Sequence, residues 1–270
     1  MDDDPAPQTV EPRAALVPAA ELQRRIAGLQ EVLREQDLDA ALLQQNADLY
    51  YYAGTVQQSY LYVPAEGQPT LFVRKVVARA RRESALGAVV ALASVRDLPA
   101  AIEDRYDSLP ARLGLELDVL PVLRFRRLED LFPEAAFEDV GRAVVRHRAV
   151  KSAWEIERIG AAARVADEVS RLLPGLLEEG LTEVEFAGRV EAEARRLGHE
   201  GFIRMRGFNQ EMFYGQLLTG LSGCVPSYLD TPLAGAGLSP SVAQGPSFRR
   251  IGRGEPVVFD FVPVRDGYMA

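Results

Sequence analysis

The stretch Tyr60-Leu-Tyr-Val-Pro-Ala-Glu-Gly-Gln-Pro-Thr-Leu-Phe-Val73 holds two apolar, β-branched and aromatic runs separated by Glu66-Gly67. Runs of this kind on either side of a glycine-containing turn predict a β-hairpin. Upstream, four apolar residues recur at helical spacing: Leu22, Ile26, Leu29 and Leu33. Residues 40–43 then predict a strand, so a helix and a strand precede the hairpin.

Helices and strands keep alternating after the hairpin. Asn46 or Asp48 can cap a short helix between the first strand and the hairpin. Further helices are predicted over residues 76–84, 99–106 and 125–131, and further strands over 88–92, 112–117 and near Phe137. Such alternation favours an α/β layer with a largely parallel sheet.

The second half of the chain opens with two helices. Ser152 with Glu155, and Thr182 with Glu185, both have the spacing of a capping box, in which each side chain satisfies a free backbone donor at a helix start. The first helix is expected to kink or stop at Pro174-Gly175. After a second helix that ends at Gly198, glycines and prolines separate short β-rich runs, of which residues 212–218 and 257–262 are the clearest.

Three segments follow from these patterns. Residues 1–20, with three consecutive aspartates and four prolines, predict a disordered arm. Residues 21–147 predict an α/β domain that ends in a basic connector, and residues 148–270 predict a second domain.

Composition excludes several classes of protein. The 270 residues are 47% hydrophobic and 26% charged, and 31 Lys+Arg against 39 Asp+Glu give a net charge of −8. These values are typical of a globular protein and speak against a generic nucleic-acid binder, which needs a basic surface. The single cysteine cannot form an internal disulfide, and no stretch is long and apolar enough to cross a bilayer. We therefore expect a cytoplasmic protein without membrane partners.

Few residues are candidates for nucleophilic catalysis. His147 lies in the basic connector and His199 follows the helix end at Gly198, and both positions favour a structural role. Cys224 has no adjacent base in the sequence, which disfavours an activated thiolate. No glycine-rich phosphate loop follows a predicted strand.

Asp260 is the carboxylate that stands out, because it follows Pro256-Val-Val-Phe259 in a predicted central strand. Burying an unpaired carboxylate is costly, so a cation or fixed donors should accompany it. The alternative is an ion pair with Arg253 or Arg265. Asp266-Gly267 predicts a hairpin turn in the first place, and a metal ligand at Asp266 only in the second.

The chain from about Leu22 onward resembles the aminopeptidase P and creatinase group of pita-bread metallopeptidases, the Xaa-Pro peptidases. The first half carries three of the motifs: Asp48-Leu-Tyr-Tyr-Tyr-Ala-Gly54, Val63-Pro-Ala-Glu-Gly-Gln-Pro-Thr-Leu-Phe-Val-Arg74 and Leu113-Gly-Leu-Glu116. The junction and second half carry the rest: Arg148-Ala-Val-Lys-Ser-Ala-Trp-Glu-Ile156, Gly180-Leu-Thr-Glu183, Gly245-Pro-Ser-Phe248, Gly254-Glu-Pro-Val-Val-Phe-Asp260 and Gly267-Tyr268. The resemblance implies a creatinase-type N-terminal α/β domain over residues 21–147 and the first half of a pita-bread catalytic domain over residues 148–270.

The resemblance also implies a cofactor. In this group the catalytic domain holds two divalent metal ions, and its ligands of two aspartates, one histidine and two glutamates suit manganese, cobalt or zinc. Asp260 matches the first of these aspartates, and the second is expected one position after Ala270. We therefore expect the 270 residues to be an incomplete, inactive form of a longer metallopeptidase that binds no metal stably.

The resemblance further implies a peptide substrate and a homodimer formed through the N-terminal domain. One position departs from the pattern, since Ala243 stands where the group usually has a substrate-binding histidine. This departure keeps open a non-catalytic protein that binds peptides or a protein partner. A creatinase-like C–N hydrolase or a lyase also stays open, because fold alone does not choose the reaction.

Overall fold

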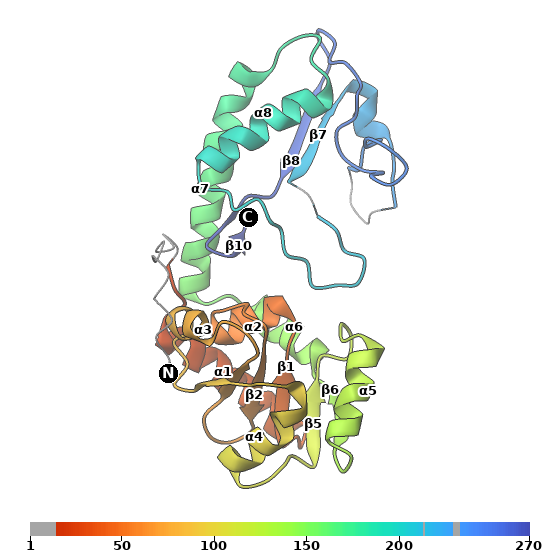
Figure 1. The fold of residues 1–270 in the computed structure, drawn as a ribbon. Coiled ribbons are helices and arrows are strands. Elements are labelled where there is room, and N and C mark those ends of the chain that lie inside the picture. The colour runs from red at the N-terminus through yellow and green to blue at the C-terminus, as the bar shows by residue number, and fades with distance from the viewer. Residues whose placement is uncertain (1–14, 213, 229–232) are drawn as a thin grey trace. The chain divides into compact units, whose positions relative to one another are not determined.

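In the computed structural model, which describes residues 15–212, 214–228 and 233–270, the strand predicted at residues 40–43 is β1 (Ala40–Leu43). Five further strands lie in the same sheet: β2 (Ser59–Pro64), β3 (Thr70–Val73), β4 (Val89–Ala91), β5 (Arg112–Leu115) and β6 (Ala136–Asp139). Their order across the sheet is β4-β3-β2-β1-β5-β6. Figure 1 labels four of them, β2, β1, β5 and β6. The predicted α/β layer is confirmed.

The directions of the strands decide which of their ends meet. β2 and β3 form the predicted hairpin, with Tyr62 opposite Thr70. β2 is antiparallel to β1 and β3, whereas β1, β5 and β6 pair in parallel and β3 is parallel to β4. Only β2 therefore runs against the other strands, and the carboxyl ends of those other five lie at one edge of the sheet.

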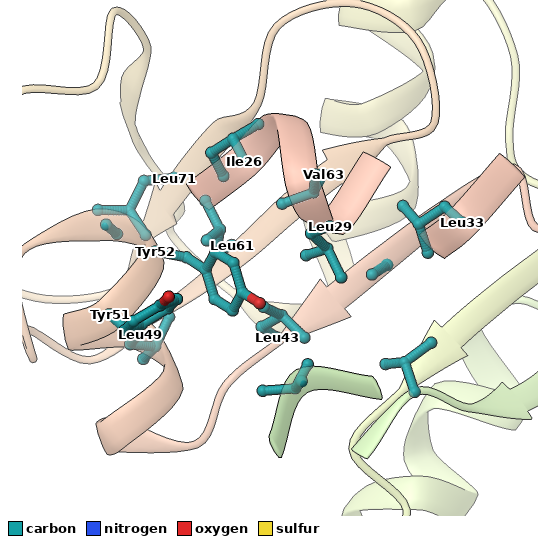
Figure 2. Close-up of a cluster of buried hydrophobic side chains, with 14 of the residues drawn as sticks. Ile26, Leu29, Leu33, Leu43, Leu49, Tyr51, Tyr52, Leu61, Val63 and Leu71 are labelled. Atoms are coloured by element: carbon teal, nitrogen blue, oxygen red, sulfur yellow. The ribbon is translucent and has the colours of Figure 1, made fainter. Parts of the chain in front are cut away.

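One face of this sheet is covered by four helices: α1 (Ala19–Glu35), α2 (Asn46–Ala53), α3 (Val77–Glu83) and α6 (Gly141–Ala149). The predicted helical stripe of α1 packs there, and Leu29 and Leu33 contribute to a core with Leu43, Leu61 and Val63 (Figure 2). These side chains are at most 1% exposed. Burying one such aliphatic side chain is worth about 1.5–3 kcal/mol, so this face accounts for much of the stability of the sheet.

The opposite face is covered by α4 (Leu98–Tyr106) and α5 (Val122–Leu131). Leu42 and Phe72 point to this side, because side chains alternate between the two faces of a strand. They pack with Leu98, Ile102 and Leu128 in a second buried cluster. The sheet is thus a middle layer between two layers of helices.

The chain divides into two compact units, Met1–Val150 and Lys151–Ala270. The division falls just after the predicted boundary at residue 147. Of the predicted arm over residues 1–20, residues 1–14 lie outside the described part of the chain. The prediction of disorder is wrong for residues 15–20, because α1 begins at Ala19 and Val17 is buried with 1% exposure.

The second unit begins with the two predicted helices, α7 (Ala153–Leu176) and α8 (Glu183–Arg196). Both capping boxes are confirmed: the Ser152 hydroxyl accepts from the Glu155 N–H at 3.1 Å, and the Thr182 hydroxyl accepts from the Glu185 N–H at 3.2 Å. α7 continues past Pro174 and ends at Leu176. A proline in the last turn removes only one helical hydrogen bond, which explains why the helix passes through it.

Two antiparallel strand pairs follow, β7 (Gly215–Thr219) with β8 (Val257–Phe261), and β9 (Val264–Arg265) with β10 (Tyr268–Met269). β7 packs on the helices through Leu217 and β8 through Phe259. Leu217 joins Val165, Phe186, Val190 and Ile251, which precedes β8, in a third core. A chain that resembles half of a two-part domain is expected to leave Phe186 and Val190 partly uncovered. That expectation is wrong, since they are 1% and 0% exposed.

Poor cover of an apolar side chain is observed at the start of α7, where Ile156 is 61% exposed.

None of the helices in residues 15–212, 214–228 and 233–270 has the length and apolar content that crossing a bilayer demands.

Candidate functional site

Asp260, the predicted metal ligand, lies on β8 directly opposite Gln216 of β7. Opposed residues of an antiparallel pair share one face, so these two side chains lie on the face away from the core that Leu217 and Phe259 help to form. Within the described residues β8 pairs with β7 alone, so the prediction of a central strand around Asp260 is wrong. Asp260 is exposed, whereas Gln216 is 7% exposed. The Gln216 Oε1 atom is buried and accepts no hydrogen bond from the described residues.

These two oxygen-bearing side chains do not make a metal centre by themselves. Within the described ranges, no three His, Cys, Asp or Glu side chains come together as a possible metal site. A two-metal centre needs several carboxylate or imidazole ligands, so the described residues do not fit one. The alternative ion pair of Asp260 with Arg253 or Arg265 does not form in the described part of the chain. Asp260 stays a predicted ligand.

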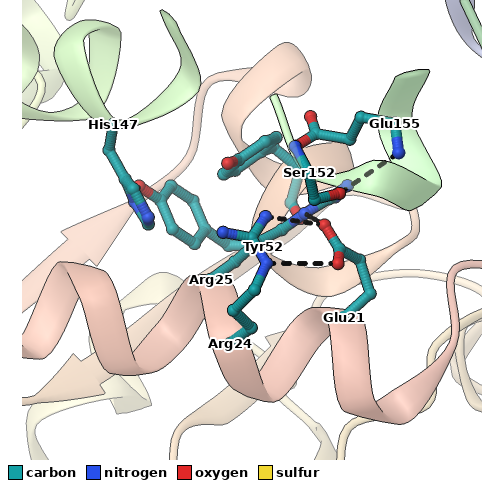
Figure 3. Close-up of polar contacts among 8 residues, drawn as sticks. Glu21, Arg24, Arg25, Tyr52, His147, Ser152 and Glu155 are labelled. Carbon is teal, nitrogen blue, oxygen red and sulfur yellow. Dashed lines mark hydrogen bonds and ion pairs between the residues drawn. The ribbon is translucent and has the colours of Figure 1, made fainter. Parts of the chain in front are cut away.

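Both histidines have structural partners. His199 is 4% exposed, and its Nδ1 accepts from the Val264 N–H at 2.9 Å, which places the proton of the neutral ring on Nε2. Burial, and next the charge of Arg195, lower the pKa of His199. His147 shares a hydrogen bond of 2.9 Å with the Tyr52 hydroxyl (Figure 3). A Cβ atom at Gly28 would lie 2.5 Å from its Nε2, so the ring fills the space above that glycine.

The other candidates also take local positions. Cys224 is exposed and free at the end of a short 3₁₀ turn, Gly220–Cys224. Asp266 and Gly267 have φ of 53° and 75° and connect β9 to β10, which confirms the predicted hairpin turn. Ala243 is half-buried and its carbonyl accepts from the Ser227 hydroxyl.

Two buried carboxylates, each the last residue of a sequence motif and neither predicted as a site residue, organise the polar interior. The first is Glu183, at the start of α8 and 0% exposed. It accepts five hydrogen bonds: from Thr219 N–H at 2.7 Å, Thr219 Oγ1 at 2.9 Å, Ser222 Oγ at 3.0 Å, Ser247 N–H at 3.0 Å and Ser247 Oγ at 2.7 Å. The motifs at residues 180–183 and 245–248 therefore meet at this carboxylate.

The second is Glu116, at the end of β5 and 1% exposed. Its Oε2 accepts from the backbone N–H groups of Gln44 at 2.8 Å and Gln45 at 3.0 Å. Burial, and next the neighbouring Asp48 carboxylate, raise the pKa of Glu116 to about 8. Asp48 itself is buried and accepts from Arg148 Nη1 at 2.8 Å. Three motifs separated by up to 100 residues thus meet in one buried cluster.

A third buried polar group lies on α1. Arg25 is 0% exposed, donates to Glu21 at 2.8 Å and to the Tyr51 carbonyl at 2.7 Å, and stacks 4.1 Å from the Tyr51 ring centre. Glu21 also accepts from Arg24 at 2.8 Å (Figure 3). The i, i+4 spacing of Glu21 and Arg25 is visible in the sequence and predicts their ion pair, but the sequence does not predict the burial of Arg25.

Comparison with known proteins supports the resemblance inferred from these motifs. The model of the Creatinase/Prolidase N-terminal domain matches residues 25–150. An uncharacterized peptidase of Staphylococcus epidermidis is 26% identical over 180 residues, which cover 64% of this chain and 50% of that protein. One from Staphylococcus saprophyticus is 27% identical over 179 residues with the same coverage. The chain spans about half the length of these curated relatives.

Solved structures show the same fold. The prolidase of Pyrococcus horikoshii has a TM-score of 0.72 at 22% identity, covering 92% of this chain and 62% of its own. The Xaa-Pro dipeptidase of Bacillus anthracis has a TM-score of 0.75 at 18% identity, covering 92% and 63%. Residues 25–150 therefore match the Creatinase/Prolidase N-terminal domain, and the chain has the fold of the prolidase and Xaa-Pro peptidase structures.

Proposed function

We propose that this protein is an Xaa-Pro aminopeptidase-like metallopeptidase that removes N-terminal residues from peptides, including proline-containing ones. The observation that carries the proposal is the creatinase/prolidase N-terminal domain over residues 25–150, followed by a unit that shares the fold of prolidase structures. The naming of the Staphylococcus relatives as peptidases supports the same class of reaction.

Asp260 would be one ligand of a pair of divalent metal ions, with manganese, cobalt or zinc as candidates. Its exposed position beside the unpartnered Gln216 Oε1 supports this role, because hard cations prefer oxygen ligands. Since the described residues do not form a two-metal centre, no catalytic step is assigned to them. We expect residues 1–270 alone to be inactive as a peptidase. Activity would need a chain as long as those of the relatives.

Metal analysis and peptide hydrolysis by a form of the protein as long as its relatives test this proposal. We expect about two equivalents of metal per chain and release of the residue that precedes proline. Asp260→Asn should lower both metal content and activity. Asp167→Asn, at an exposed position of α7, is the matched control and should change neither. Full activity of Asp260→Asn would remove this residue from the site.

A second function is a non-catalytic protein that binds peptides or a protein partner. Ala243, at the position where the resemblance implies a histidine, favours it. Saturable binding of proline-containing peptides without metal uptake or hydrolysis would support this alternative. Hydrolysis of creatine, or elimination without water, would instead support the creatinase-like C–N hydrolase or the lyase.

We further propose that the complete protein is a cytoplasmic homodimer that pairs through its first unit. Val122 and Leu123 on α5 are 66% and 83% exposed, and two neighbouring apolar side chains on one helix are suited to an interface. Light scattering should return twice the chain mass. A monomer mass across the micromolar range would reject the dimer.

A further inference from the structure

A small cavity of about 180 Å³ lies in the first unit and is lined mainly by polar side chains. Six of them are Gln44, Gln58, Tyr60, Arg74, Arg124 and Arg127. Gln44 directly follows β1, Arg74 directly follows β3, and Gln58 directly precedes the oppositely directed β2. The cavity is therefore at the edge of the sheet where the carboxyl ends of the parallel strands lie, the edge at which open α/β sheets bind ligands.

The strand alternation explains why these residues are on the same side. Leu42 and Phe72 point into the core beneath α4 and α5, so Gln44 and Arg74, two residues further along, point to that side as well. Tyr62 also contributes to that core, so Tyr60 and Gln58 continue its row toward the edge. The polar rim of the cavity is thus an extension of the apolar core face.

α5 supplies one wall of the cavity. Arg124 and Arg127 are three residues apart and therefore lie on one side of the helix, next to Leu128, which anchors α5 in the core. Arg124 Nη1 donates to Gln44 Oε1 at 3.3 Å, and Arg74 Nη1 donates to the backbone carbonyl of Leu92 at 3.5 Å and to that of Ala93. Arginines from the sheet and from the helix thus meet at one cavity.

The charge of the cavity is uncompensated. No carboxylate lines it, and Arg74, Arg124 and Arg127 have no ion pair with any described residue. By contrast, Arg112 of the same unit pairs with Asp37 and Glu138. The backbone N–H of Gln44 donates to the buried carboxyl of Glu116, and burial raises the pKa of Glu116, which favours its neutral form. Three positive charges at one cavity are notable in a chain whose net charge is −8.

We propose that this cavity binds a small oxyanion with two negative charges, of the phosphate or dicarboxylate class. Guanidinium groups recognise such anions through paired hydrogen bonds, and the carboxamides and the Tyr60 hydroxyl add neutral donors. The volume is below the roughly 300–1,000 Å³ of pockets for drug-sized ligands, so the ligand is a compact ion rather than a nucleotide. The proposed site is formed by residues of the first unit, whereas Asp260 belongs to the second, and the proposal does not depend on peptidase activity.

Isothermal titration calorimetry of the 270-residue chain tests the proposal with sodium phosphate, sodium succinate and, as a monoanion, sodium acetate, all at constant ionic strength. We expect saturable binding of phosphate or succinate with one site per chain and at least about tenfold weaker binding of acetate. The tighter of the two dianions identifies the class. Absence of saturable binding by both dianions, or acetate binding as tight as theirs, would overturn the proposal.

Variants locate the site. Arg124→Gln and Arg127→Gln change exposed side chains and should each weaken dianion binding about tenfold or more. Arg126→Gln is the matched control, because Arg126 is exposed on the same helix but does not line the cavity, and its affinity should stay within about twofold. Equal weakening by all three variants would show binding to the general surface charge. Unchanged affinity of Arg124→Gln and Arg127→Gln would place the anion elsewhere, and both results contradict the proposal.

Discussion

Replacing Glu116 by Gln should stabilise the first unit at alkaline pH, although Glu116 is a buried residue that accepts two backbone hydrogen bonds. The glutamine Oε1 can accept from the N–H groups of Gln44 and Gln45 as the carboxyl oxygen does. Its amide N–H can donate to the Asp48 carboxylate, as the protonated carboxyl does. Glu116→Gln therefore copies the protonated form of the residue.

The size of the effect follows from the raised pKa. A carboxyl that ionises near pH 4.5 in the unfolded chain, but near pH 8 in the folded unit, releases its proton first from the unfolded chain. The free energy of unfolding of the natural protein therefore has its full contribution from this group below pH 4.5 and falls as the pH rises toward 8. Each pKa unit corresponds to about 1.36 kcal/mol, so the shift from 4.5 to about 8 sets an upper limit of about 5 kcal/mol on the gain of Glu116→Gln over this range.

Hydrogen exchange of the peptides that contain β1 and β5, measured in both proteins from pH 5 to pH 8.5 and corrected for intrinsic exchange rates, reports this difference for the first unit alone. Glu129→Gln, at an exposed position of α5, is the control and should change the free energy of unfolding by less than about 0.5 kcal/mol at each pH. A difference between Glu116→Gln and the natural protein that stays constant or shrinks with pH would show that Glu116 is ionised when folded, and would refute the reasoning.

Three further predictions concern the second unit. Glu183→Ala leaves the backbone N–H groups of Thr219 and Ser247 and three hydroxyls without their acceptor, which should lower the free energy of unfolding by about 1–3 kcal/mol for each buried backbone donor. The region around β7 should then undergo rapid hydrogen exchange. Glu183→Gln, which keeps one acceptor oxygen, should lower the free energy of unfolding less. Because the pKa of His199 is lowered in the folded unit, the stability of this unit should fall as the pH drops below about 6.5. His199→Asn should reduce this dependence of the free energy of unfolding on pH, measured by denaturation at several pH values and followed by Trp154 fluorescence. Because Ile156 at the start of α7 is 61% exposed, limited proteolysis should leave a fragment that ends near Arg148 as the most resistant product, whereas equal resistance through Asp260 would show that both units are equally stable.

The elements that the sequence predicted correctly depend on residues close together in the chain. The capping boxes at Ser152 and Thr182 join residues three apart, and the Asp266-Gly267 turn needs only two residues with positive φ. The hairpin and the alternation of helices and strands follow in the same way from periods of two and 3.6 residues. The helix end predicted at Pro174-Gly175 differs from the observed end at Leu176 by one residue, because a proline in the last turn removes only one helical hydrogen bond.

The sequence by itself therefore determined most helices and strands, the turns, the class of fold and the resemblance to Xaa-Pro peptidases. It missed α6, whose residues were predicted to be a basic connector, because the burial of Val144 against the sheet is a tertiary contact. Only the tertiary structure decided which polar residues meet. Asp48, Glu116 and Arg148 come together from α2, β5 and α6, and Glu183 meets Ser247 across 64 residues. Arg74 and Arg124 likewise meet at one cavity only because β3 and α5 end and begin at the same edge of the sheet. A local pattern records which face a side chain occupies, but strand order and helix packing, which arise from burial of the whole core, determine which faces come into contact.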